Sequence, residues 1–345
     1  METLFGIDYP SLWFIVISIV FAGYAVLDGF DFGAGAWHLG LRTDEHRRIS
    51  LNAIGPIWDG NEVWLVIGGG ALFAGFPLMY ASFFSALYIP FMLFLVVIIF
   101  RAVSIEFRSK EAMKWWTNTW DISYSVSSIL LAFLLGVVLG NILQGISLGE
   151  NFEYEGGALF DFLNPYALLI GLSNLTLCMT HGALFMLTKT EGDVHKKYTR
   201  WVWIGFSLFF IFFSISNIYT HTSFPHLSDT FTNNPILFII PVFALFAIIL
   251  SAKLTHVKNY SKAFLSSGVF IVLLISTIAI ELYPTLLQST ISEEYTITVY
   301  NAASSDKTIG IMLLMVAIGF PLLIAYTIFA YKIFNGKVKL DEHSY

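Results

Sequence analysis

Charged residues are scarce in this sequence. Asp, Glu, Lys and Arg together make up 12% of its 345 residues, about half of the share of roughly a quarter that is typical of soluble globular domains. Hydrophobic residues make up 57%, and the mean hydropathy is +0.73. This composition excludes an ordinary soluble domain and predicts an integral membrane protein. Alternating ten-residue strand patterns are also lacking, which argues against a transmembrane barrel.

Cysteine is nearly lacking as well, since Cys178 is the single one and lies within a hydrophobic run. An intrachain disulfide is therefore excluded, and we interpret Cys178 as a small apolar side chain. Basic residues are scattered along the chain, and the formal net charge is −6. Because a nucleic-acid-binding surface is basic, no DNA or RNA partner is expected.

Long apolar runs separated by short polar loops dominate the rest of the chain. Each run has the length that a helix needs to cross about 30 Å of hydrocarbon. Hydropathy predicts an all-α, polytopic protein with nine spans, at about residues 11–37, 61–79, 81–100, 120–142, 165–187, 201–219, 235–252, 263–283 and 309–331. The largest loop is too short to bury a core of its own, so residues 1–345 are predicted to form a single integral membrane domain.

The lysines and arginines predict the orientation, because cytosolic loops near the spans carry an excess of basic residues. Of the 18, only Lys307 falls in one set of loops. The other 17 fall in the opposite set: Arg42, Arg47, Arg48, Arg101, Arg108, Lys110, Lys114, Lys189, Lys196, Lys197, Arg200, Lys253, Lys258, Lys262, Lys332, Lys337 and Lys339. The N-terminus is therefore predicted outside and the C-terminus in the cytosol, which agrees with an odd number of spans.

Four carboxylates lie within or at the cytosolic ends of the first two spans. Asp28 and Asp31 are three residues apart, and so are Asp59 and Glu62. Residues three apart share a helix face, and the short connection makes the two helices neighbours, so the four acids can converge. Carboxylates inside a membrane are costly and usually functional, which favours a path that takes up protons from the cytosol. In the alternative interpretation, Asp59 and Glu62 cap a helix while Asp28 and Asp31 pair with loop arginines.

Further polar residues near the same end have counter-charge or structural interpretations. Arg101 ends the third span and either extends to the interface or balances the carboxylates. We assign similar supporting roles to Trp58, Asn61, Glu106 and Asp121.

Small residues in the first two spans favour helix packing. Gly29, Gly33 and Gly35 in the first span, and the glycine run 68–70 in the second, allow close approach of helix backbones in lipid. A phosphate loop would need a preceding strand and a following Lys-Ser/Thr, and neither exists.

Histidine is too sparse inside the spans to predict a haem site. Haem-binding membrane bundles commonly use facing His or Met ligands on different helices. Of the eight histidines, only His181 falls well inside a predicted span. A lone buried histidine is more often a hydrogen-bonded core residue than a ligand. No metal or cofactor is therefore assigned to this chain, with His181 as the single weak candidate.

Taken together, several stretches resemble subunit II of the cytochrome bd-type quinol oxidases. They are residues 29–35 (GFDFGAG), the basic pair 47–48, and residues 54–64 (IGPIWDGNEVW), 68–74 (GGGALFA), 100–108 (FRAVSIEFR) and 140–145 (GNILQG). The resemblance is dense over residues 20–145 and rests on length and hydropathy afterwards. Glu62 and residues 54–56 are more similar to the cyanide-insensitive branch of the family.

The resemblance implies two four-helix bundles and one peripheral helix. The first bundle would cover about residues 11–142, the second bundle with the peripheral helix about 165–331, and a cytosolic tail 332–345. It also implies a bacterial or archaeal plasma membrane and a homologously folded subunit I, which carries haem b, haem d and the quinol site and reduces oxygen to water. A small single-helix accessory subunit is a further expected partner.

In that family this subunit is a scaffold with a cytosolic proton path, and the acid of the Trp-Asp-Gly-Asn motif, Asp59 here, is linked to it. This chain would thus be a non-haem subunit of an oxidoreductase. Some members hold a structural quinone or a haem in this subunit, and the residues assign neither. Two alternatives stay open: an ion-coupled transporter, motivated by the carboxylates and glycine-rich helices, and a scaffold without a proton role.

Overall fold

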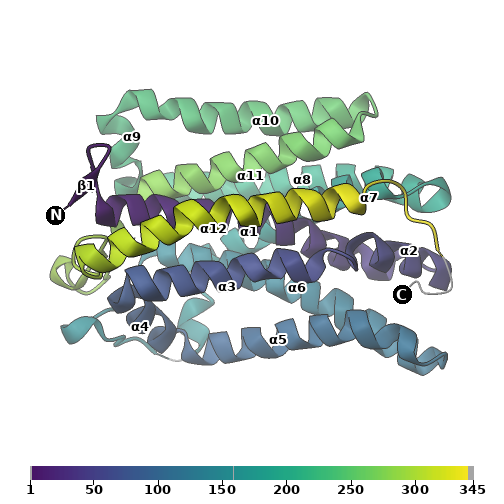
Figure 1. Cartoon of the computed structure of the whole chain (residues 1–345), viewed down its shortest axis with the longest axis horizontal. Helices are drawn as coiled ribbons and strands as arrows, with labels where there is room; N and C mark the ends of the chain where they lie inside the picture. Colours follow the sequence, from purple (N-terminus) through teal and green to yellow (C-terminus); the bar gives the residue numbers. More distant parts are fainter. Residues whose placement is uncertain (1, 158, 341–345) are drawn as a thin grey trace.

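The computed structural model describes residues 2–157 and 159–340, and helices that run side by side make up most of it (Figure 1). The last five residues of the predicted tail, 341–345, lie outside the described part. The helices are α1 (Tyr9–Trp37), α2 (Asp44–Ile54), α3 (Trp58–Gly75), α4 (Pro77–Ala86), α5 (Tyr88–Phe107), α6 (Lys114–Gln144), α7 (Pro165–Lys189), α8 (Gly192–Ser223), α9 (Asp229–Asn233), α10 (Ile239–His256), α11 (Tyr260–Leu282) and α12 (Asp306–Ile333).

Within the described ranges, eight helices are long and apolar enough to cross a membrane, and the bent pair α3–α4 would make nine. The chain is thus an all-helical membrane protein, as the sequence predicts. The predicted second span, 61–79, is wrong at its end, because α3 stops at Gly75 and α4 leaves at 119°. Phe76 has non-helical dihedral angles and Pro77 has no N–H to continue the ladder. The third span consequently begins at Tyr88 rather than near residue 81.

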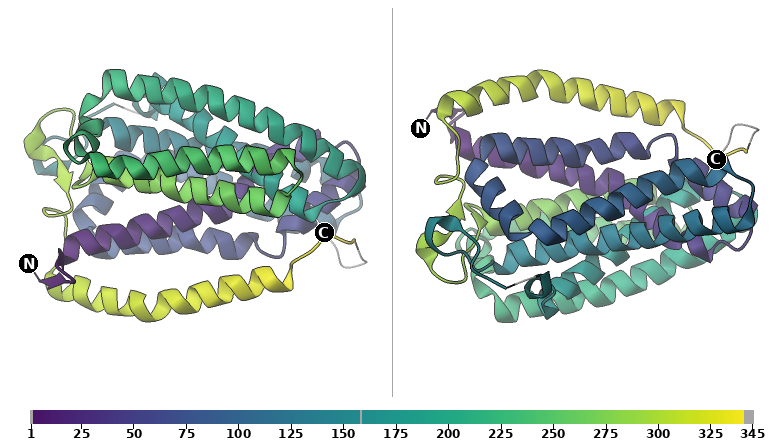
Figure 2. Two further views of the ribbon diagram at one scale, coloured as in Figure 1. Left: turned by 90° about the horizontal axis from the view of Figure 1, so that it is seen from above. Right: turned by 90° about the horizontal axis from the view of Figure 1, so that it is seen from below.

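Helix α1 is the centre of the molecule and packs against α3, α6, α7 and α11, while α6 also packs on α7. Helix α5 packs on α6, α8 on α7, and α10 on α11. We refer to α1, α3, α5 and α6 as the first group, and to α7, α8, α10 and α11 as the second group. Helix α12 lies on the outside, next to α1 and α3 (Figure 2).

The two groups pack closely where α1 crosses α7, and α6 also packs along α7. A Cβ atom on Gly33 would collide with the backbone of Cys178 and approach Gly182. A Cβ atom on Gly35 would likewise collide with the Ser128 side chain of α6, whereas a Cβ on Gly29 would make only an ordinary contact with Cys178. Gly33 and Gly35 therefore act in packing, since only residues without a side chain allow this approach.

Several helices begin with a recognisable cap. The Asp8 side chain accepts from the backbone N–H of Ser11 at 2.9 Å at the start of α1. Asn164 accepts from the N–H of Ala167 at 2.8 Å, and Pro165 occupies the first turn of α7. These side chains satisfy backbone donors that lack a partner within the helix.

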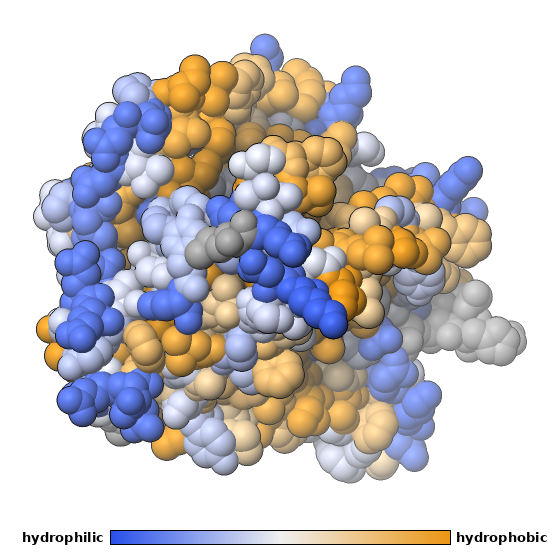
Figure 3. Space-filling view, turned by 60° about the vertical axis from the view of Figure 1, so that its left-hand side comes forward, coloured by the Kyte–Doolittle hydropathy of each residue, from blue (hydrophilic) through white to orange (hydrophobic). Residues whose placement is uncertain are grey.

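The N-terminus lies at one end of the bundle, and α12 runs towards the opposite end, which we call the C-terminal end (Figure 1). Helix α2 and the turns after α5, α7 and α10 also lie at the C-terminal end. The other end carries two small antiparallel hairpins, β1 (Thr3–Leu4) with β2 (Ile7–Asp8) and β3 (Thr285–Leu287) with β4 (Ile297–Thr298). Hydrophilic residues gather over the loops there, and hydrophobic side chains cover much of the flanks (Figure 3).

Candidate functional site

Two acidic side chains of α1 are completely buried near the C-terminal end of the bundle. Asp28 and Asp31 are both 0% exposed and lie about one helical turn apart. Phe30, between them in the sequence, and Phe32, directly after Asp31, are buried as well. An isolated ionised carboxylate is very costly in such surroundings, so each acid needs a partner or a proton.

Arg101 of α5 supplies the counter-charge. Its Nη2 donates to Asp28 Oδ1 at 3.2 Å, and its Nη1 donates to Glu62 Oε2 at 3.3 Å. The guanidinium also lies over the Phe32 ring, 4.7 Å from the centroid, and 5.8 Å from the Trp58 ring. Arg101 is 0% exposed, so of its two predicted roles the geometry matches the counter-charge rather than an interfacial anchor.

Asp31 has a different set of contacts, because it is held by an amide instead of a cation. Asn61 Nδ2 donates to Asp31 Oδ2 at 2.8 Å, and also to the Leu27 carbonyl at 3.3 Å. The hydroxyl of Tyr331, on α12, donates to Asn61 Oδ1 at 2.8 Å. Asn61 thus joins three helices, and Tyr331 connects the outer helix α12 to the site.

The remaining two acids connect this interior to the surface. Glu62 is partly buried, with its side chain 17% exposed, whereas Asp59, in the first turn of α3, is exposed. Asp59 lies near enough to Glu62 for the two charges to interact. The four predicted acids therefore form a graded series, from exposed Asp59 through Glu62 to buried Asp28 and Asp31.

This acid cluster is defined as Asp28, Asp31, Glu62 and Arg101. One guanidinium faces three carboxyl groups, so the cluster cannot hold three ionised acids in a neutral arrangement. Asp28 Oδ2 and Asp31 Oδ1 are also buried without a hydrogen-bond partner among the described residues. Carboxyl groups that are close together and incompletely paired can take up and release a proton.

A second cluster surrounds Asp121 of α6, which is 1% exposed. Its Oδ1 accepts from His38 Nε2 and from Arg108 Nε, both at 2.6 Å, and its Oδ2 accepts from Arg47 Nη1 at 2.8 Å. Arg108 also donates to Asp44 at 2.6 Å. We call these five residues the Asp121 cluster.

The Asp121 cluster contradicts one pairing in the alternative interpretation of the sequence, in which loop arginines pair with Asp28 and Asp31. Arg47, which that interpretation paired with Asp28 or Asp31, contacts Asp121 instead. The sequence analysis does not single out His38, which directly follows the first span. A histidine directly after a span that carries two acids was the available signal. Glu106, which was predicted to be structural, lies half-buried in the last turn of α5.

His181 of α7 is engaged on both sides of its ring. Nδ1 lies 2.7 Å from Ser267 Oγ, and Nε2 lies 3.1 Å from the Val26 carbonyl oxygen. The ring is stacked on Phe264, with centroids 4.6 Å apart. A haem iron would have to displace one of these bonds inside a packed core, so the surroundings of His181 do not fit an axial ligand. Over the described ranges, no three His, Cys, Asp or Glu side chains are grouped so that they could hold a metal ion.

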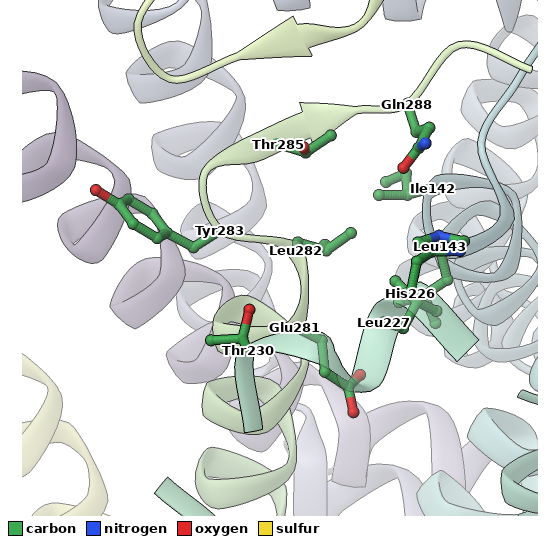
Figure 4. A pocket seen from close by; sticks show the side chains of 10 residues that line it. All are labelled: Ile142, Leu143, His226, Leu227, Thr230, Glu281, Leu282, Tyr283, Thr285 and Gln288. Atoms are coloured by element: carbon green, nitrogen blue, oxygen red, sulfur yellow. The ribbon is translucent and has the colours of Figure 1, made fainter. Parts of the chain in front are cut away.

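A cavity of about 150 Å³ lies at the opposite end of the bundle, between α6, α9 and α11. Glu281, His226, Thr230, Leu143 and Gln288 contribute to its wall (Figure 4). Because Leu143 and Glu281 are near the ends of α6 and α11 that face away from α2, this cavity is separate from the acid cluster.

The comparisons with known proteins agree with one another. A family model described as cytochrome bd terminal oxidase subunit II matches residues 9–334. The chain is 32% identical to cytochrome bd ubiquinol oxidase subunit 2 of Bacillus subtilis, over 96% of this chain and 97% of the relative. It is 29% identical to cytochrome bd-I ubiquinol oxidase subunit 2 of Escherichia coli K12, over 97% of both chains.

A solved structure supports the same fold. The bd oxidase from Geobacillus thermodenitrificans contains a chain that superimposes with a TM-score of 0.78 at 18% identity, covering 94% of this chain and 98% of that chain. The family match covers nearly the whole sequence, including the acid cluster and the Asp121 cluster. The chain therefore belongs to the cytochrome bd terminal oxidase subunit II family.

Proposed function

We propose that this chain stabilises the haem-bearing subunit of a bd-type quinol oxidase and supplies it with protons from the cytosol for the reduction of oxygen to water. The graded acid series carries this proposal, because it leads from an exposed carboxylate to two buried ones along α3 and α1. Membership in a quinol oxidase complex that includes a subunit I favours this function over an ion-coupled transporter.

The path begins at Asp59, continues to Glu62 and reaches Asp28 and Asp31. In the proposed orientation, the C-terminal end of the bundle faces the cytosol of a bacterial or archaeal plasma membrane, and the N-terminus lies outside. The basic loops support this orientation. Glu62 and Asp28 lie close together because both contact the same guanidinium, so a proton that reaches Glu62 can pass to Asp28 through water. Because Arg101 stays positively charged beside both acids, it stabilises whichever of them is ionised as the proton moves.

The haems and the quinol site belong, in this proposal, to subunit I, and so does the oxygen chemistry. His181 supports this, since its ring nitrogens already have partners. We further propose that the first group forms one four-helix bundle, the second group forms another, and α12 is the peripheral helix of a single membrane domain. The packing of the helices around α1 supports this division. A small accessory subunit, a structural quinone and a haem in this chain remain expectations from the family.

Replacement of Glu62 by Gln tests the path, because it keeps the size of the side chain and removes its proton. We expect the two-subunit complex to assemble with normal haem content and to consume oxygen at least about tenfold more slowly. Asp59→Asn should slow turnover in the same direction. The control is Glu45→Gln, which removes an exposed acid of α2 at the same end. Unchanged turnover in both Glu62→Gln and Asp59→Asn across pH would overturn the proton path.

A further inference from the structure

His38 forms a buried pair with Asp121 that the acid series does not use. It follows α1 directly, is 0% exposed, and its Nε2 lies 2.6 Å from Asp121 Oδ1. Asp121 is held by two arginines and so is expected to be ionised, and a carboxylate can only accept hydrogen bonds. Nε2 must therefore carry the hydrogen, which leaves Nδ1 as the basic nitrogen. Nδ1 is buried and has no partner among the described residues.

A carboxylate that fixes the tautomer of an imidazole also stabilises the imidazolium that forms when the free nitrogen takes up a proton. The charged and titratable groups that face His38 come from three other segments. They are Arg47 of α2, Arg108 directly after α5, and Asp121 and Tyr124 of α6. Asp44 of α2 accepts from Arg108 and, together with Asp121, offsets the charges of the two arginines.

Tyr124 lies between the Asp121 cluster and the acid cluster. Its ring meets the His38 ring edge-on, with the centroids 5.0 Å apart. It also interacts electrostatically with Arg101 and Asp31. The Tyr124 hydroxyl is buried without a partner in the described part of the chain, and the Oγ of the adjacent Ser125 is as well. Two buried polar groups without a partner, His38 Nδ1 and the Tyr124 hydroxyl, thus lie between Asp121 and Asp31, and buried groups of this kind commonly bind water.

We propose that His38 is a second proton-accepting group, held by Asp121, which delivers protons to Asp31 through the Tyr124 hydroxyl and water. Nδ1 takes up a proton from the C-terminal side to give the imidazolium, while Nε2–H stays on Asp121. The proton then leaves Nδ1 for the Tyr124 hydroxyl, which gives its own proton to water next to Asp31, and neutral His38 is restored. This inference rests on the proton function proposed for the acid cluster, and it adds a separate route into that cluster.

Tyr124→Phe is the sharpest test, because the hydroxyl that it removes makes no hydrogen bond within the described protein. A merely structural tyrosine would lose nothing, since deleting an unpaired buried hydroxyl is neutral or stabilising. The matched control is Tyr166→Phe, whose hydroxyl bonds Thr220 at 2.8 Å near the opposite end of the bundle. His38→Gln is the second variant, because its amide can still donate to Asp121 while the titratable nitrogen is lost.

The measurement is oxygen consumption and proton uptake by the purified two-subunit complex across the pH range in which imidazole titrates. We expect Tyr124→Phe and His38→Gln to slow proton uptake by about threefold to tenfold. The deficit should grow as pH rises, because proton supply then limits turnover. Haem content and thermal stability should be unchanged in Tyr124→Phe, and Tyr166→Phe should turn over normally.

Two results overturn the inference. The first is that Tyr124→Phe has wild-type proton uptake at every pH while Glu62→Gln is slow. The path through Asp59 and Glu62 would then stand, and the route through His38 would not. The second is that His38→Gln loses activity by one constant factor at all pH values together with haem, which makes His38 a structural residue. Normal uptake in Glu62→Gln and Asp59→Asn would instead contradict the proposed function itself.

Discussion

The two helix groups differ in the kind of polar residue that they bury. The first group, with the turns that follow its helices, buries charges: Asp28, Asp31, Arg101, Arg108 and Asp121. Among the described residues, the polar side chains that α7, α8, α10 and α11 bury below the surface are neutral: Ser173, Thr176, Thr180, His181, Ser216, Ser251, Thr255, Ser266 and Ser267. Glu281 is only partly buried, at the end of α11.

The neutral side chains of the second group form hydrogen bonds mostly within their own helix, and this explains why their burial costs little free energy. Thr176 donates to the Leu172 carbonyl at 2.8 Å, and Thr180 donates to the Thr176 carbonyl at 2.7 Å. The charges of the first group instead need partners from other helices, as Arg101 shows with α1 and α3. Buried charges are expensive in a membrane and usually functional. The comparison therefore supports the proposed proton chemistry in the first group, whereas the buried polar side chains of the second group serve packing.

Arg101→Met should have the largest effect, because it leaves Asp28 and Glu62 without their cation. Breaking a buried ion pair from one side costs on the order of 3–5 kcal/mol. We expect little folded complex in mild detergent and a strongly lowered midpoint of thermal unfolding. Arg101→Lys should lower the unfolding midpoint less, since an ammonium group keeps the charge but cannot contact Asp28 and Glu62 at the same time, as the planar guanidinium does. The control is Arg42→Met, which removes an exposed arginine at the same end; equal yields of the two Met variants would refute the counter-charge role.

Gly33→Ala should have the next largest effect, because it disturbs a close contact between the two groups. The new methyl group would collide with the backbone of Cys178, which cannot move without shifting α7. Overpacking of this kind typically costs about 1–3 kcal/mol. The matched control is Gly29→Ala in the same helix, where a Cβ makes only an ordinary contact. Thermal unfolding of the complex measures the difference, and similar midpoints for the two variants would contradict the close crossing.

Much of this architecture is predictable from the sequence, for local reasons. Hydropathy gives the spans, and the three-residue spacing of Asp28 and Asp31 gives their common face. The break between α3 and α4 is a local effect that hydropathy does not register, because residues 76–86 are as apolar as the spans around them. Pro77 was the signal for it.

The partners of the charges are harder to predict, because they depend on tertiary packing. Arg101 and Glu62 are 39 residues apart and meet only after the chain turns back through α4 and α5. Arg47 is 74 residues from Asp121, and its sequence position next to Arg48 indicates only a basic loop. Electrostatic pairing acts between whichever charges the helices bring together, so the sequence identified the acids but left Arg101 with two possible roles and paired Arg47 with the wrong acids.

His181→Gln should have a smaller effect, and it tests whether the neutral buried side chains of the second group serve packing alone. The variant loses at least one of the bonds to Ser267 and the Val26 carbonyl, together with the stacking on Phe264. A lost neutral hydrogen bond costs about 1 kcal/mol, so the unfolding midpoint should fall modestly. Turnover should keep its pH dependence, because this histidine has no free nitrogen to exchange a proton. A changed pH profile in an intact complex would show that the second group takes part in proton chemistry.

Tyr331→Phe should have the smallest effect, and it asks how far α12 depends on the charged side of the molecule. The variant removes the hydroxyl that donates to Asn61 Oδ1, which costs about 0.5–1.5 kcal/mol. Asn61 keeps its bond to Asp31, so turnover should stay near wild type while hydrogen exchange in α12 increases. Tyr326→Phe, an exposed tyrosine of the same helix, is the control and should change neither. If exchange in α12 is unaffected by Tyr331→Phe, packing alone holds the outer helix, and the acid cluster is supported only by α1, α3 and α5.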